Sequence, residues 1–103
     1  GPRPMFESST WSFGKIKSGE TVHATYEFTN KGTKPFCVYK VDINACKWSH
    51  SAIPVAAPGE TVSFRVHLDT TGMPKGEALA IVTLTTNSPL RPIVNLFITG
   101  WIE

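Results

Sequence analysis

Few side chains in this sequence are able to do chemistry, and three of them gather in one short segment. Cys46, Trp48 and His50 alternate within residues 44–57, the longest stretch without a clear strand pattern. A thiol and an imidazole can act as nucleophile and base, or can bind a metal ion. Catalysis also needs an orienting group and an oxyanion site, and no Gly-x-Ser-x-Gly motif is present. We therefore interpret Trp48 as a cap on a core, and we expect no catalytic residue and no cofactor.

Two further histidines, His23 and His67, each lie on the polar side of a segment in which apolar and polar residues alternate. In an immunoglobulin-like topology, the second and fifth strands are antiparallel neighbours. A register summing to about ninety would bring the two imidazoles together. Such a pair could hold a metal ion, and Cys46 is the remaining candidate ligand. A third nearby ligand would have to be Asp69 or Glu27, so we favour two solvent-facing histidines and no metal.

Aromatic residues give a second set of candidates. Trp11, Trp48 and Trp101, together with Tyr39, could form a platform on which sugar rings stack, as in carbohydrate-binding modules. The competing interpretation is that Trp11 and Trp101, which belong to terminal segments, pack on each other or on the core. The candidate binding residues are therefore Trp48, His50, Trp11 and Trp101, for a protein partner or a glycan.

Charge and hydropathy exclude several classes of partner. The net charge of +2 comes from ten basic and eight acidic residues that are well interspersed. The basic stripe expected of a nucleic-acid-binding protein is missing. No apolar run approaches the ~20 residues that span a bilayer, and no signal peptide or lipidation motif is visible. Gly1 and Pro2 look like a protease scar. We expect residues 1–5 to be a tag remnant or disordered, and residues 6–103 to form one domain.

The hydrophobic period is two, which predicts strands. Residues 21–29 and 61–69 alternate strictly, as half-buried antiparallel strands do, and 6–13, 36–43, 77–86 and 93–102 are further candidates. About seven short strands in a chain of this length predict an all-β, immunoglobulin-like, two-sheet antiparallel sandwich. The residues expected in its core are Val22, Tyr26, Phe28, Val62, Phe64, Val66, Leu68, Val82, Leu84, Leu96 and Ile98.

The two cysteines leave the redox state open. Cys37 lies inside a predicted strand and Cys46 in the segment that follows it. An oxidising compartment would allow a disulfide between them. We favour two free thiols, with Cys37 a small core residue.

Several short motifs occur in a characteristic order. They are FGKIKSGE at 13–20, YEFTNKG at 26–32, IP at 53–54, APGE at 57–60, DTTG at 69–72, TLTTNSP at 83–89 and ITG at 98–100. Together, from residue 6 to residue 102, they resemble the bacterial domain of unknown function 1573 family. That family is an immunoglobulin-like relative of the ASH and major-sperm-protein domains.

The resemblance implies an exported module of the bacterial envelope, periplasmic or on the cell surface, without known catalysis. Such domains often carry Cys-Gly-Cys after the third strand, where this chain has Asn44-Ala45-Cys46 and a single thiol. The expected function is therefore a non-catalytic interaction or spacer module that adds a partner's strand to an exposed sheet edge. The alternative is a carbohydrate-binding module that uses exposed tryptophans.

Overall fold

The computed structural model describes residues 1–103 as strands, turns and loops, without a helix that could span a membrane. The strands are β1 (Pro4–Phe6), β2 (Thr10–Ile16), β3 (Thr21–Asn30), β4 (Val38–Ile43), β5 (Trp48–His50), β6 (Thr61–Asp69), β7 (Gly76–Thr86) and β8 (Ile93–Ile102).

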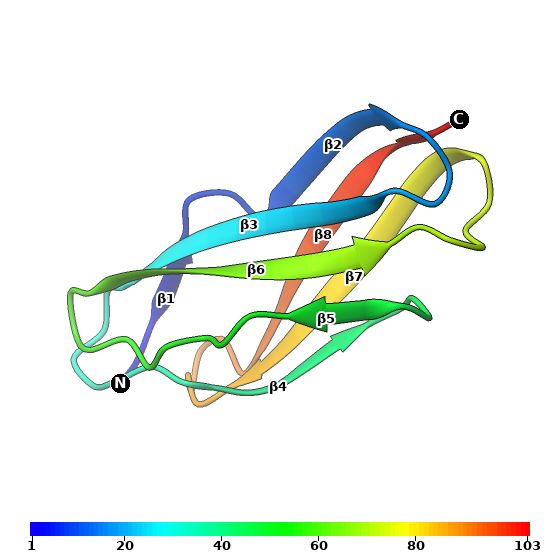
Figure 1. Ribbon diagram of the computed structural model, residues 1–103. Coiled ribbons are helices and arrows are strands. Elements are labelled where there is room, and N and C mark those ends of the chain that lie inside the picture. Colours follow the sequence, from blue (N-terminus) through cyan, green and yellow to red (C-terminus); the bar gives the residue numbers. More distant parts are fainter.

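The strands form two four-stranded sheets packed face to face (Figure 1). Sheet A has the order β1-β3-β6-β5 and sheet B the order β2-β8-β7-β4. All neighbours are antiparallel except β2 and β8, which are parallel. The predicted all-β sandwich is confirmed.

The predicted first strand at 6–13 is wrong, because the chain changes sheets within it. β1 pairs with β3 in sheet A, whereas β2 pairs with β8 in sheet B. At the crossing, the Ser8 hydroxyl donates to the Thr10 carbonyl (3.0 Å) and accepts from the Thr10 N–H (3.2 Å). These local bonds replace ladder bonds where the chain leaves one sheet for the other. Gly14 lies inside β2, where the register shifts.

The first five residues contact the rest of the domain. Pro4 and Met5 belong to β1, and the Arg3 carbonyl accepts a hydrogen bond from the Lys31 N–H (2.7 Å). The Pro2 carbonyl accepts from the buried Ser88 hydroxyl (2.7 Å). The residues that resemble a protease scar therefore pack against two turns of the domain.

The core lies between the sheets and is built from the alternating apolar residues of the long strands. Of the predicted core residues, all are buried except Val62, which is partly exposed and packs against the cluster. The Tyr26 hydroxyl donates across the sandwich to the carbonyl of Phe97 in β8 (2.7 Å), and burial raises the pKa of this hydroxyl. The two sheets are thus joined by a hydrogen bond as well as by apolar packing.

Two turns of the same design precede β3 and β6, at residues 17–20 and 57–60. In each, the third residue is a glycine with positive φ, 92° at Gly19 and 83° at Gly59. The glutamate that follows accepts a bond from the N–H of the first turn residue, at 2.6 and 3.0 Å respectively. Glycine supplies the backbone conformation and glutamate caps the turn, so each Gly-Glu pair starts a long strand.

Asn30, at the end of β3, holds one end of the sandwich together. It is completely buried, and its Oδ1 accepts from the N–H groups of Arg3 (3.1 Å) and Gly32 (2.9 Å). Its Nδ2 donates to the carbonyls of Lys34 (2.8 Å) and Ala56 (2.9 Å). An asparagine amide has two acceptor sites and two donor hydrogens, and all four are used here. These contacts give Asn30 a structural role.

We predict that Asn30→Ala lowers the free energy of unfolding by about 2–4 kcal/mol, because it leaves buried backbone groups without partners. Thr29→Ala is the matched control, since Thr29 shares only an exposed hydroxyl–hydroxyl bond with Thr61 (2.7 Å). It should cost no more than about 1 kcal/mol. Urea denaturation measures the free energy of unfolding of both variants. Equal losses would contradict the structural role of the four Asn30 hydrogen bonds.

Candidate functional site

His23 and His67 lie opposite each other on β3 and β6, so the predicted register is confirmed. Their Nδ1 atoms are 2.7 Å apart, and the rings meet at 70° with centroids separated by 4.9 Å. A hydrogen bond between two ring nitrogens needs one N–H and one lone pair. One ring therefore carries its proton on Nδ1, whereas the other presents a bare Nδ1. The pair projects from the outer face of sheet A.

Neither of the two candidate third ligands, Asp69 and Glu27, lies directly opposite either histidine. Asp69 lies opposite Thr21, and its Oδ1 accepts from the Thr71 N–H (2.9 Å). Hydrogen bonds from Thr71, first from its backbone, hold the pKa of the Asp69 carboxyl below its ordinary value. Glu27 lies opposite Ser63, further along the ladder. No group of three histidine, cysteine, aspartate or glutamate side chains gathers where it could hold a metal ion.

The segment holding Cys46, Trp48 and His50 contains strand β5, which the sequence pattern did not predict. Trp48 and His50 lie opposite the buried residues Leu68 and Val66, so both point toward the interior side of sheet A. Their rings stack at an interplanar angle of 20° and a centroid distance of 6.3 Å. Cys46 and Cys37 are both free thiols, and Cys46 is the exposed one.

The three tryptophans do not form one aromatic platform. Trp11 pairs with the buried Ile98 and so lies on the interior side of sheet B, where it is 36% exposed at the open edge. Trp101 is 50% exposed and points outward from β8, since its neighbour Ile102 is buried. Trp48 belongs to the other sheet. The carbohydrate alternative is therefore left without a shared stacking surface.

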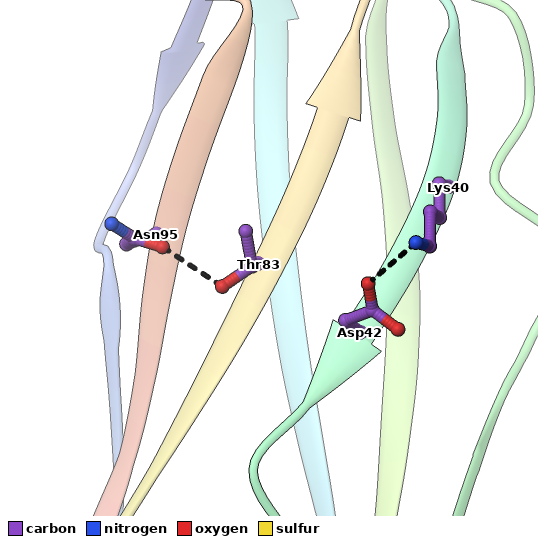
Figure 2. Close-up of polar contacts among 4 residues, drawn as sticks. All are labelled: Lys40, Asp42, Thr83 and Asn95. Carbon is purple, nitrogen blue, oxygen red and sulfur yellow. Dashed lines mark hydrogen bonds and ion pairs between the residues drawn. The ribbon is translucent and has the colours of Figure 1, made fainter.

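The outer face of sheet B is divided into an apolar and a polar part. Around Trp101 and Leu79, an open depression of about 720 Å³ crosses β2, β8 and β7. Toward β4 the face is polar: Asp42, Thr83 and Asn95 lie in one row across three strands. Figure 2 shows the Thr83 hydroxyl donating to Asn95 Oδ1 (3.0 Å) and the ion pair of Asp42 with Lys40 (3.2 Å).

Strand β4 forms the edge of sheet B, and its outer side is unpaired. Every backbone hydrogen bond of its residues runs to β7. The Asn44 N–H donates to the Ile81 carbonyl (3.4 Å). This bond shows which alternate residues direct their backbone N–H and C=O groups toward β7. Bonded and free positions alternate along an antiparallel pair, so the N–H and C=O groups of Val41 and Ile43 point away from β7.

A small groove lies beside this free edge. It has a volume of about 140 Å³, and it is lined by Val38, Tyr39, Lys40, Val41, His50 and Ile53. Tyr39 is 68% exposed and occupies the bulge at which the β4 register shifts. His50, one of the predicted binding residues, is thus brought next to the edge. The unpaired backbone itself carries no side-chain signature, and the sequence pattern did not single it out.

The arrangement defines an immunoglobulin-like sandwich in which the first strand is divided between the two sheets. Among solved structures, a protein of unknown function from Porphyromonas gingivalis W83 is similar, with a TM-score of 0.78 and 18% identity. The match covers 97% of this chain and 46% of that one. The chain therefore spans less than half the length of that protein.

Two further structures show the same fold. A PapD-like (ASH) domain of human CEP192 has a TM-score of 0.70 and 11% identity, covering 97% of this chain and 84% of the other. The periplasmic chaperone SfaE has a TM-score of 0.60 and 12% identity, covering 98% and 57%. The sequence matches no curated protein. Over residues 5–102 it matches the family described as protein of unknown function DUF1573, and the chain belongs to that family.

We predict that the two paired histidines adopt different tautomers in solution at neutral pH. Long-range nitrogen–proton NMR spectra should show one ring protonated on Nδ1 and the other on Nε2, because the short contact requires one donor and one acceptor. In the variant His67→Ala, the signals of His23 should shift while those of His50 stay unchanged. Identical tautomers that do not respond to this substitution would contradict the pairing.

Proposed function

We propose that this domain is a non-catalytic interaction module that binds an extended segment of a protein partner along the free edge of β4. The observation that supports this function is the set of outward backbone groups at Val41 and Ile43 beside the groove. An added strand would pair with these groups and gain main-chain hydrogen bonds. Specificity would come from alternate side chains entering the groove.

The other sheet edges fit this role less well. β1 and β5 have three residues each, and β1 begins with proline. The register of β2 shifts between Ser12 and Lys15, which divides its edge into two short runs. β4 keeps a continuous register from Lys40 to Ile43. A continuous ladder is what a partner strand needs, since a bulge twists an edge away from further pairing.

The walls of the groove define the chemistry of the partner segment. Val38, Val41 and Ile53 are only partly buried, and each packs against the core cluster. An apolar side chain placed among them would cover this surface at about 25 cal/mol per Å². Tyr39 and His50 at the rim offer a hydroxyl and an imidazole to polar groups. We therefore expect an extended peptide with a small apolar residue facing the groove.

The setting we propose is the bacterial envelope, with the domain as an exported part of a longer protein. Three findings support it: the family resemblance, the match to less than half of a Porphyromonas gingivalis protein, and the fold shared with a periplasmic chaperone. In such a chain the domain would also space its neighbours, since its longest axis is 45 Å.

Selection of random displayed peptides on the domain tests this function. We expect the selected peptides to bind with perturbation of the Val41 and Ile43 amide signals in nitrogen–proton NMR spectra. Val41→Pro should weaken binding at least about tenfold, because proline removes a donor from the outer side of the strand but none from the β7 ladder.

Two variants serve as controls. Val41→Thr keeps the donor and the β-branched shape, and should bind within about threefold of the unchanged domain. Asp42→Pro breaks the β7 ladder instead, and should lower the melting temperature more than Val41→Pro does. Peptides that perturb only the depression around Trp101, or that bind Val41→Pro equally well, would overturn the proposal.

A further inference from the structure

The histidine pair on sheet A is separate from the β4 edge and has its own chemistry. His23 and His67 project from the longest continuous ladder of sheet A, two pairs from its Thr21–Asp69 end, where β3 and β6 pair without a shift as far as Thr29–Thr61. Their backbones are therefore fixed relative to each other. Only side-chain rotation changes the distance between the two rings.

We propose that His23 and His67 form a two-imidazole site for a divalent transition-metal ion. The two Nδ1 atoms already face each other at 2.7 Å. Two imidazole nitrogens bound at about 2.0–2.1 Å to one ion are about 2.9–3.3 Å apart for bond angles between square and tetrahedral. When both rings turn so that their Nδ1 lone pairs converge on one point, an ion can bind both nitrogens with little change in their separation.

Ion binding replaces the hydrogen bond without a net loss of protons. In the pair, one ring carries hydrogen on Nδ1 and donates it to the other. When that hydrogen moves to Nε2 of the same ring, both Nδ1 lone pairs become available to the metal. Both rings then stay neutral, which is the form of histidine that binds metal ions.

The surroundings of the pair determine which ions fit. Ser49 lies opposite His67 on β5, and no carboxylate or thiol joins the two rings to make a group of three. Imidazole ligands suit Cu²⁺, Ni²⁺ and Zn²⁺, whereas Mg²⁺ and Ca²⁺ prefer oxygen. Because the pair lies on an outer face, solvent would fill the remaining coordination positions.

Titration of the whole chain with Zn²⁺ and with Ni²⁺ tests the site, and Cys46→Ser serves as background because Cys46 is the exposed thiol. Calorimetry should show one ion per chain. The ring-proton NMR signals of His23 and His67 should shift together while those of His50 stay in place. His23→Ala and His67→Ala should each weaken binding at least about tenfold, since one remaining imidazole cannot chelate.

His50→Ala is the matched control, because His50 lies on the opposite face of sheet A and is the only other histidine. It should bind as tightly as the background chain. Thermal melting checks the folding of each variant, and His67→Gln, a polar side chain of similar reach, provides a second test at the same position. The proposal is overturned if neither ion binds, if binding survives both alanine substitutions, or if the signals of His50 move instead.

Discussion

The four hydrogen bonds of the Asn30 amide are the interaction on which the rest of the architecture depends. They join the N-terminal segment, the turn after β3 and the carbonyl of Ala56. Ala56 in turn pairs with Phe36 through two backbone bonds of 2.9 and 3.0 Å, just before β4. One buried side chain therefore fixes both where β1 enters sheet A and where the chain starts toward the free edge of sheet B. A buried amide of this kind stabilises only when every partner is present.

The closed interior explains why the proposed sites lie on the outer faces and edges of the sheets. Apolar side chains and the Tyr26 ring fill the space between the sheets, and no buried side-chain polar atom lacks a partner. What remains for recognition are outer faces and sheet edges. On sheet B the outer face offers apolar Trp101 and Leu79 at one end and the polar row ending at Asp42 at the other. The proposed binding edge and the histidine pair therefore belong to different sheets, and they can act independently.

The sequence predicted those parts of the fold in which side chains alternate over many residues. A register summing to about ninety was inferred from the alternation of two long strands, and the structure pairs His23 with His67. β1 and β5 were not predicted because three residues are too few to show a period. Trp11 and Trp101 were visible by type, but a β-bulge and a parallel pairing decide which face each occupies. The free edge of β4 could not be predicted at all, since unpaired backbone groups leave no pattern in side chains.

The central functional claim is that the outer side of β4 is free to pair with a partner strand. Amide hydrogen exchange along β4 in the free domain tests it most directly. We expect the Val41 and Ile43 amides to exchange at least about tenfold faster than those of Asp42 and Asn44, because only the latter donate to β7. Uniform slow exchange through all four residues would show that the outer side of β4 is already paired, and it would contradict a free binding edge at β4.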